Sequence, residues 1–317
     1  MDSRATRGFV TIATGERHYY EIARNLLRSY RLFSRRLVPF AIICDQENDI
    51  TSEFDDVILI RNPRRSFLDK LRLPELVPYD ETVFIDADCL AYRDLNGLWK
   101  FFSNCGDFAT LGYAFPEWKH GWFRLEDTGE FRDKVNFSMV FQGGAYFLRK
   151  GRLDSFSATC GYILDHYDSF AFPGYPAKSP VDEPVFALAC SIHNYLPAAS
   201  YKDVFGYYPL CGSLKADISK GRLSYRYPPK LFKSPGGYFV HWSTAETSGE
   251  LYKEETRKLD KMLESGFKPP RRWELRRKMV DLCFACVNGL SAFVKRVLPR
   301  DLGAGLYSYL NSKRFKK

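Results

Sequence analysis

The stretch that decides the fold is Glu81-Thr-Val-Phe-Ile-Asp86-Ala-Asp88, in which aromatic and β-branched residues lead into two carboxylates. Short apolar runs that alternate with helical segments are typical of βαβ units, whose parallel strands are buried on both faces. In open sheets of this kind, ligands bind at the carboxyl ends of the strands. We therefore expect Asp86 and Asp88 to lie at a ligand-binding edge of a parallel sheet.

The segments on either side of this stretch complete an α/β pattern. β-rich apolar runs predict strands, and apolar residues at helical spacing predict helices. The expected strands are 8–14, 37–44, 56–60, 81–88, 107–113, 136–148 and 237–241, with 136–148 forming one or two strands broken at Gly143-Gly144. The expected helices are 18–33, 66–76, 94–102, 151–167, 181–192 and 250–263. The sequence predicts an α/β fold, Rossmann-like, with a mostly parallel sheet and helices on both faces.

One long segment, 114–135, separates two of the expected strands. It is rich in Trp, Gly and charged residues and has no helical or strand period. Because loops of this length in a compact domain are more often functional than filler, we expect it to contact substrate.

Composition places the chain among globular proteins. Its 317 residues fit one large domain or two small ones, and its 45% hydrophobic and 16% aromatic content excludes a disordered chain. The eight cysteines show no framework spacing, so we expect no disulfides. Cys283 and Cys286 have no second pair to complete a zinc site, so neither a zinc nor a redox role is expected.

The positive charge is concentrated near the C-terminus. Residues 268–317 hold 13 basic and three acidic residues, a net charge of +10, whereas 1–267 carry a net charge of −1. Since the body lacks a diffuse basic surface, we expect no nucleic-acid partner. Pro269 and Pro270 mark the boundary between a predicted catalytic domain, 1–267, and a basic tail, 268–317.

The tail has the pattern of an amphipathic helix that lies on an anionic membrane surface. Its apolar stripe consists of Val280, Cys283, Phe284, Val287, Val294 and Leu298. A helix packed on the catalytic domain is the alternative. The apolar stretch 279–294 is too short to span a bilayer, and the N-terminus lacks the apolar region of a signal peptide. We therefore expect a cytoplasmic protein that is peripheral at the inner face of the membrane.

The two carboxylates after the strand predict a metal site. Side chains alternate faces along an extended backbone, so Asp86 and Asp88 should project the same way. Like charges this close repel each other unless a cation lies between them, and hard oxygen ligands favour Mn²⁺ or Mg²⁺. A turn with two solvated carboxylates is the alternative.

Other motifs precede and follow the Asp86 and Asp88 strand: Phe9-Val-Thr-Ile-Ala-Thr14, Asp69-Lys70-Leu71, Phe141-Gln-Gly-Gly144, Asp182-Glu183 and Tyr238-Phe-Val-His241. In the order of these motifs the sequence resembles the retaining nucleotide-sugar glycosyltransferases of GT-A fold, the family of glycogenin and the lipopolysaccharide galactosyltransferases. The resemblance spans 8–263.

The resemblance implies a role for each matching residue. Thr11, Ala13, Thr14 and Tyr19 would hold the nucleotide base and ribose, while Lys70, Asp86 and Gly143 would also contact the donor. Asp86, Asp88 and His241 would bind the metal. Asp182 would be the catalytic carboxylate at the transferred sugar, and Gln142 would orient the sugar hydroxyls.

Two departures from the family pattern concern the donor. The Lys-Pro-Trp that follows the family's metal His is absent after His241, where the chain reads Trp242-Ser-Thr-Ala-Glu-Thr-Ser-Gly249. This puts the phosphate contacts in doubt. Gln142 replaces an Asn and Glu183 replaces a Gln, so the identity of the transferred sugar stays open.

Four of these residues also have structural interpretations. His241 could be a packed core histidine, and Tyr19 could lie on the apolar face of the first helix. Lys70 could be a solvated surface lysine. Asp182 could cap the following helix, because Asp is favoured at that position and Pro184 would fit the first turn.

The resemblance implies a metal-dependent glycosyltransferase that moves a sugar from a nucleotide-sugar donor, a UDP-sugar, to a saccharide or glycolipid acceptor with retention. A nucleotidyltransferase is a second possibility, although Ala13-Thr-Gly-Glu-Arg17 is not a Gly-rich, basic phosphate loop. A non-catalytic scaffold with a degenerate transferase fold is a third.

Overall fold

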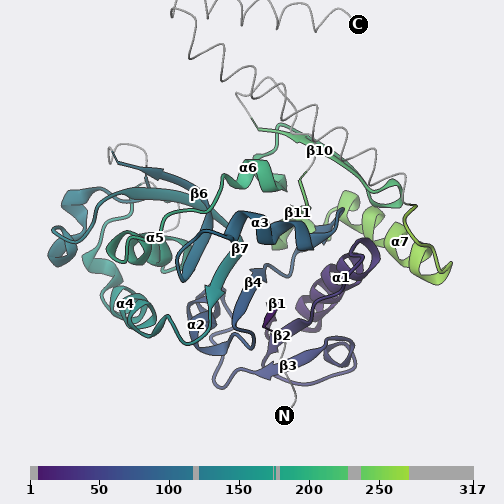
Figure 1. Cartoon of the computed structure of the whole chain (residues 1–317), viewed down its shortest axis with the longest axis horizontal. Coiled ribbons are helices and arrows are strands. Elements are labelled where there is room, and N and C mark those ends of the chain that lie inside the picture. The colour runs from purple at the N-terminus through teal and green to yellow at the C-terminus, as the bar shows by residue number, and fades with distance from the viewer. Residues whose placement is uncertain (1–5, 117–120, 174, 176–178, 228–236, 271–317) are drawn as a thin grey trace, which may run out of the picture. The chain divides into compact units, whose positions relative to one another are not determined.

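The computed structural model (Figure 1) describes residues 6–116, 121–173, 175, 179–227 and 237–270. Its centre is a six-stranded sheet in the order β3-β2-β1-β4-β7-β6. The first four of these strands run parallel, and β7 is antiparallel to both of its neighbours. The strands are β1 (Arg7–Ala13), β2 (Phe40–Cys44), β3 (Asp56–Leu59), β4 (Glu81–Ile85), β6 (Phe108–Phe115) and β7 (Ser138–Arg149). The predicted mostly parallel α/β sheet is confirmed.

Helices cover both faces of this sheet, as the sequence predicts. On one face Phe9 of β1 packs edge-on against Tyr30 of α1, and Phe147 of β7 stacks on Phe102 of α3. Figure 1 shows α1 beside α7, and α4 beside α5. The helices are α1 (Arg17–Phe33), α2 (Leu73–Leu76), α3 (Trp99–Phe102), α4 (Asp154–Asp165), α5 (Asp182–Ile192), α6 (Tyr201–Val204) and α7 (Glu250–Glu264).

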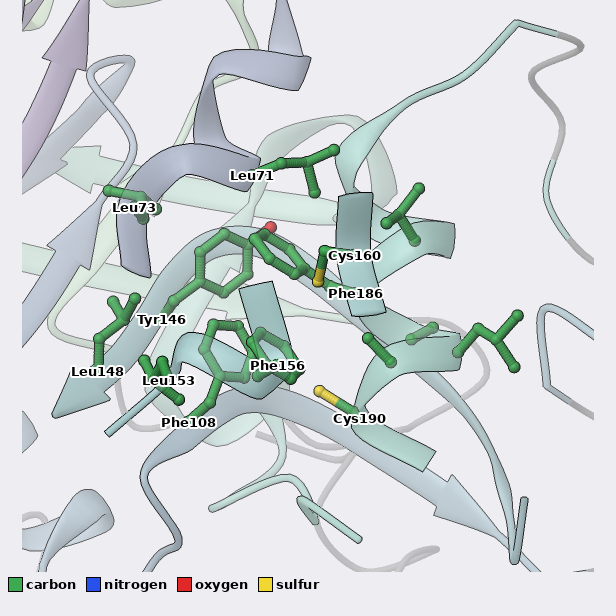
Figure 2. Close-up of a cluster of buried hydrophobic side chains, with 14 of the residues drawn as sticks. Leu71, Leu73, Phe108, Tyr146, Leu148, Leu153, Phe156, Cys160, Phe186 and Cys190 are labelled. Atoms are coloured by element: carbon green, nitrogen blue, oxygen red, sulfur yellow. The ribbon is translucent and has the colours of Figure 1, made fainter. Parts of the chain in front are cut away.

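The other face of the sheet carries the apolar cluster shown in Figure 2. Tyr146 of β7 packs edge-on against Phe186 of α5, and Phe108 of β6 lies 4.5 Å, between ring centroids, from Phe156 of α4. Since fully burying one such side chain stabilises a fold by about 1.5–3 kcal/mol, this cluster fixes α5 against β7. The position of the acidic residues at the start of α5 depends on this packing.

Two small sheets lie outside the central one. The first has the order β5-β11-β8, formed by β5 (Cys89–Ala91), β11 (Phe239–His241) and β8 (Phe205–Tyr207). The second pairs β9 (Ser213–Asp217) with β10 (Arg222–Arg226). The strand predicted at 237–241 therefore exists, but it belongs to the first small sheet. The pattern of apolar residues did not predict the short strands β5, β8, β9 and β10.

Three predicted elements differ in detail from the structure. β4 ends at Ile85, and Asp86 to Cys89 form a turn closed by a hydrogen bond from the Cys89 N–H to the Asp86 carbonyl (3.2 Å). β7 is not broken at Gly143-Gly144, although its pairing with β6 shifts register between Thr110 and Gly112, opposite that pair. The helix expected at 66–76 is a 3-10 helix, Phe67–Arg72, followed by α2.

Three further predictions concern cysteines, the membrane and the tail. The six cysteines in the described part of the chain are all free, as predicted. Within the described ranges, no helix combines the length and apolar character needed to cross a bilayer. The amphipathic helix predicted at 279–294, and the pair Cys283 and Cys286, lie outside the described residues.

Candidate active site

Asp86, Asp88 and His241 come together at the carboxyl end of β4. Each offers one ligand atom, and the three atoms lie within 4.8 Å of one another. His241 Nε2 is 3.1 Å from Asp88 Oδ1 and 3.6 Å from Asp86 Oδ2. His241 is buried, as the core interpretation has it, and its imidazole faces two carboxylates, as a metal ligand would.

Convergence of the two aspartates comes from a turn and not, as predicted, from alternation along an extended strand. The turn reverses the chain into β5, which pairs antiparallel with β11 so that Cys89 lies opposite His241. One residue beyond this pair, the Trp242 N–H donates a hydrogen bond to the Asp88 carbonyl (3.1 Å). This register places the side chain of Asp88 beside that of His241.

Gly144 gives the imidazole the space it occupies. A Cβ atom at this position would lie 2.9 Å from His241 Nδ1 and 3.1 Å from Phe205 Cζ. Real Cβ atoms essentially never come that close to another heavy atom, so any side chain here would displace the ring. Glycine at position 144 thus leaves room for the imidazole of the histidine. In the sequence, the only sign of this requirement for glycine is the Gly-Gly pair.

The three side chains perturb one another electrostatically. Burial raises the pKa of Asp86, which Lys70 opposes and Asp88 reinforces. Burial also acts to raise the pKa of Asp88, but its attraction to His241 holds it below the ordinary value. Burial acts to lower the pKa of His241, whereas Asp88 raises it above the ordinary value. The cluster is thus an acidic pair whose charge a cation can balance.

The donor atoms of this cluster fit a divalent cation. Asp88 Oδ1 is buried and faces His241 Nε2 at 3.1 Å, and His241 Nδ1 is buried without a hydrogen-bond partner among the described residues. Two carboxylate oxygens and one imidazole nitrogen make the mixed donor set that suits Mn²⁺ and tolerates Mg²⁺. The alternative of a turn with two solvated carboxylates is wrong, because the side chains of Asp86 and Asp88 are only 17% and 6% exposed.

Lys70 links this cluster to the acidic start of α5. Its Nζ lies 2.6 Å from Asp86 Oδ2 and 3.8 Å from Asp182 Oδ2. Burial acts to lower the pKa of Lys70, but the two carboxylates raise it well above the ordinary value, so the ammonium is charged at neutral pH. The alternative of a solvated lysine is wrong, since Lys70 is buried.

Asp182 and Glu183 lie next to this lysine but have different surroundings. Asp182 is buried and accepts a hydrogen bond from the Tyr146 hydroxyl (2.9 Å). It is the first residue of α5 and makes no capping hydrogen bond, so the capping interpretation is wrong. Glu183 is only half-buried, and its Oε1 accepts a hydrogen bond from the Gly143 N–H (2.6 Å).

Gln142 and Gly143 are neighbours on β7, and the N–H of Gly143 donates to Glu183. Gln142 is half-buried, and Gly143 is buried. A Cβ atom on Gly143 would lie 3.1 Å from Glu183 Oε1 and 3.6 Å from Lys70 Nζ. Glycine at position 143 therefore allows the half-buried Glu183 and the buried Lys70 to approach the backbone of β7.

The residues predicted to hold the nucleotide base differ in how exposed their side chains are. Thr11 is fully buried and Ala13 is 2% exposed, so neither presents a surface to a ligand in this conformation. Thr14 is half-buried and donates a hydrogen bond to Asp69 Oδ2 (3.3 Å). Tyr19 is 38% exposed, so it does not lie on the buried face of α1 and is free to stack on a ligand.

A cleft of about 630 Å³ lies at the ends of β2 and β3. Asp45 and Arg65 line it and are joined by an ion pair (3.2 Å). Arg65 has a left-handed backbone (φ 52°), which is held by Asp69, whose carboxylate accepts hydrogen bonds from the N–H groups of Arg64 (2.8 Å) and Arg65 (2.9 Å). Backbone strain of this kind often marks a binding site, and sequence reasoning missed both Asp45 and Arg65.

Sequence reasoning also missed residues close to the candidate metal ligands. Thr244 donates a hydrogen bond to Asp88 Oδ2 (3.1 Å), and Ser243 before it has a left-handed backbone (φ 67°). Tyr207 of β8 lies with its ring centroid 5.0 Å from that of His241. The segment after His241, where the Lys-Pro-Trp of the family is absent, thus contributes to the site by holding Asp88.

Comparison with known proteins gives structural matches only. No protein-family model matches the chain, and no curated protein sequence matches it. Among solved structures, the chain is similar to the galactosyltransferase LgtC in complex with donor and acceptor sugar analogues (TM-score 0.48, 12% identity, 84% of this chain and 99% of that chain). It is also similar to the glycosyltransferase GlyE of Streptococcus pneumoniae TIGR4 (TM-score 0.46, 11% identity, 84% and 65%).

A third similar structure is the bifunctional glycosyltransferase WbbM (TM-score 0.44, 13% identity, 77% of this chain and 46% of that chain). The chain therefore spans nearly the whole of LgtC but less than two thirds of GlyE and of WbbM. Identities and TM-scores this low do not establish the function of this chain. We therefore infer its function from the chemistry of its own site.

Proposed function

We propose that this protein is a metal-dependent glycosyltransferase that moves a sugar from a nucleotide-sugar donor, a UDP-sugar, to a saccharide or glycolipid acceptor. One observation carries the proposal: Asp86, Asp88 and His241, from two distant segments, converge with ligand atoms within 4.8 Å beside the charged Lys70. Such a cluster suits a divalent cation, and a cation bound there would stabilise the diphosphate of the donor as a leaving group.

The site offers distinct surroundings for the parts of the donor. A divalent ion, Mn²⁺ or Mg²⁺, held by Asp86, Asp88 and His241 would supply Lewis-acid stabilisation of the diphosphate leaving group. Lys70 adds a fixed positive charge next to Asp86. Tyr19 and the cleft lined by Asp45 and Arg65 would receive the nucleoside.

Asp182 and Gln142 would act on the transferred sugar. As the bond to the leaving oxygen breaks, positive charge develops at the anomeric carbon, and a nearby carboxylate stabilises it. The hydrogen bond from Tyr146 and the proximity of Lys70 hold Asp182 in one orientation. Gln142, with both a donor and an acceptor, would orient the sugar hydroxyls. Retention of the anomeric configuration is the outcome that the family resemblance implies.

The test is hydrolysis of UDP-sugars by the full-length protein with and without Mn²⁺. A glycosyltransferase releases UDP and free sugar slowly in Mn²⁺ and much less with a chelator present, and the anomer first seen by NMR reports retention or inversion. Release of UMP and sugar phosphate would indicate a nucleotidyltransferase instead. A protein that binds no donor and releases nothing would be a scaffold.

We also propose that the tail attaches the protein peripherally to anionic membranes, because 268–317 carry a net charge of +10. Each basic residue near an anionic surface contributes about 1 kcal/mol, and salt weakens this attraction. Replacing Arg271, Arg272, Arg276, Arg277 and Lys278 with Gln should reduce co-sedimentation with anionic vesicles and leave the weak binding to neutral vesicles unchanged. Equal binding of both proteins to anionic vesicles would contradict this role.

A further inference from the structure

His18 is a residue of α1 to which the mechanism above gives no role. It is exposed, and its Nε2 lies 3.1 Å from the hydroxyl oxygen of Thr247, 229 residues further along the chain. Thr247 is buried in a short 3-10 helix, Thr244–Ser248, which follows the strand of His241. Because α7 comes directly after this 3-10 helix and lies beside α1 (Figure 1), the contact joins two parts of the fold that are distant in sequence.

The hydrogen bonds of Thr247 have a defined direction. Its hydroxyl donates to the Thr244 carbonyl at 2.7 Å, and a hydroxyl group has a single hydrogen to donate. The hydroxyl oxygen therefore accepts from His18, whose imidazole carries a hydrogen on Nε2. A neutral imidazole with this hydrogen and a charged imidazolium can both donate it, so the contact does not depend on the charge of His18.

The same 3-10 helix also contacts a candidate metal ligand. The Thr244 hydroxyl donates to Asp88 Oδ2 at 3.1 Å, while Asp88 Oδ1 faces His241 Nε2 at 3.1 Å. Asp88 is thus at one end of a series of hydrogen bonds, and His18 is at the other. The series runs from His18 Nε2 to Thr247 Oγ1, from Thr247 Oγ1 to the Thr244 carbonyl, and from Thr244 Oγ1 to Asp88 Oδ2.

The backbone of this segment needs support from outside it. Ser243, directly before Thr244, has a left-handed backbone (φ 67°), and a residue other than glycine keeps such a conformation only where the surrounding structure holds it. On one side of Ser243, the buried Trp242 anchors the chain by packing. On the other side, the hydrogen bond between Thr247 and His18 attaches the chain to α1.

From this arrangement we propose that His18 is a positioning residue for the metal site, acting through the 3-10 helix to hold the Asp88 carboxylate in the orientation of a ligand. The inference rests on the proposed function, because it assumes that Asp88 binds a divalent cation. A carboxylate that is already held in place loses less conformational freedom when the cation binds, so the affinity for the metal is higher.

The expected size of the effect follows from the distance of His18 from the ligand. Removing a group that directly holds a metal ligand costs about 10–100-fold in affinity, and Thr244 is such a group. His18 acts two hydrogen bonds further away, through Thr247, and residues at that remove have smaller effects. We therefore expect His18→Ala to weaken Mn²⁺ binding by about threefold to tenfold.

The test measures Mn²⁺ affinity by calorimetry in full-length wild type, His18→Ala and His18→Gln, without any nucleotide. Because no donor is present, a direct contact between His18 and a donor cannot contribute to the result. Gln can place an N–H donor where the Nε2 of histidine lies, so His18→Gln should retain most of the wild-type affinity. Since His18 is exposed, both variants should fold. His166→Ala, at an exposed histidine stacked on Tyr162, is the matched control and should bind Mn²⁺ as wild type does.

A double-mutant cycle tests whether the effect passes through Thr247. Thr247→Val removes the hydroxyl and nearly keeps the shape, so it should weaken Mn²⁺ binding at least as much as His18→Ala does. Adding His18→Ala to Thr247→Val should then cause no further loss, because the hydrogen bond is already absent. Thermal unfolding of the metal-free proteins is measured alongside, since a merely structural contact would lower the Tm and leave Mn²⁺ affinity unchanged.

The remaining outcomes decide against the inference. If wild type binds Mn²⁺ and His18→Ala binds it equally well, the inference is overturned while the proposed function stands. The same conclusion follows if His18→Gln loses as much affinity as His18→Ala, or if the two losses add in the double variant. If wild type binds no Mn²⁺, both the proposed function and the inference fail. Should Thr247→Val not fold, the comparison of His18→Ala with His18→Gln decides alone.

Discussion

His241 Nε2 lies 3.1 Å from Asp88 Oδ1 because the antiparallel pairing of β11 with β5 sets the two segments side by side. The hydrogen bond from Thr244 to Asp88 Oδ2 (3.1 Å) fixes the carboxylate from its other oxygen. One aspartate thus has one oxygen turned toward the histidine and the other held by the protein. This arrangement makes Asp88 the ligand whose substitution tests the metal site most directly.

Asp88→Asn should weaken Mn²⁺ binding by at least about 100-fold and abolish Mn²⁺-dependent donor binding. Loss of a partner that only supports a ligand already costs 10–100-fold in affinity, and Asp88 is proposed as a ligand itself. Asn keeps the shape and can still accept from Thr244, so the fold should persist. Calorimetric titration with Mn²⁺ measures the change.

Asp49→Asn is the control, because Asp49 is an exposed residue that forms an ion pair with Arg17 on the surface. It should bind Mn²⁺ as wild type does. Retention of wild-type Mn²⁺ affinity in Asp88→Asn would show that the aspartate pair is not the metal site.

His241→Ala should raise the Mn²⁺ concentration needed for half-maximal donor binding by about tenfold, with binding restored at high metal concentration. The two carboxylates remain, so the site loses a ligand and keeps its charge. His166→Ala, an exposed histidine stacked on Tyr162, should leave the titration unchanged. An unshifted titration in His241→Ala would assign His241 a purely packing role.

Gly144→Ala tests the same site through the backbone of β7. The added Cβ would meet His241 Nδ1 at 2.9 Å, so the imidazole must move, and displacements of about 0.5 Å already degrade such sites. We expect Mn²⁺ affinity to fall about tenfold. Gly161→Ala, in α4 with nothing within 4 Å of its Cβ, should instead stabilise the fold by up to about 1 kcal/mol and keep Mn²⁺ affinity.

The sequence was sufficient to predict the central sheet and the identity of the clustered residues. The apolar run before Asp86 and the helical stripe of α1 are local patterns, and local patterns predict strands and helices. His241 was connected to the aspartates only through the family resemblance. The physical reason for the contact, which is the pairing of β5 with β11, joins two three-residue strands far apart in the sequence and has no periodic signal.

The residues that sequence reasoning missed share this non-local origin. Asp45 and Arg65 meet because Asp69 holds two backbone N–H groups of an irregular loop. Tyr207 reaches His241 from β8, within a region that reads only as rich in Tyr, Pro and Gly. Hydrogen bonds between a side chain and a distant backbone depend on the folded geometry, so composition and period do not reveal them.

Lys70→Met should destabilise the metal-free protein by about 3–5 kcal/mol, because it leaves the half-buried carboxylate of Asp86 and the buried carboxylate of Asp182 without their cation. Saturating Mn²⁺ should recover part of this loss, since a bound cation balances Asp86. Urea unfolding of wild type and variant, with chelator and with Mn²⁺, measures both values. An equal loss of stability in the two conditions would separate Lys70 from the metal site.

Glu183→Gln should change the pH dependence of stability even without any ligand. Burial raises the pKa of Glu183 from 4.5 to about 7, so the folded protein favours the protonated form. The stability that this preference contributes is fully present below pH 4.5 and is lost as the pH rises through about 7. Gln mimics the protonated carboxyl at every pH, so wild type and variant should be similar in stability at pH 5, and the variant should be the more stable at pH 8.

The expected difference at pH 8 is on the order of 1–3 kcal/mol, because one pKa unit corresponds to about 1.4 kcal/mol and the side chain is only half-buried. For a domain of this size, that raises the Tm of Glu183→Gln above that of wild type by at least about 2 °C. Thermal unfolding at both pH values measures it, with Glu264→Gln as the control that should show no such dependence. A difference in Tm between wild type and Glu183→Gln that is the same at pH 5 and pH 8 would mean that Glu183 titrates as an ordinary surface carboxylate.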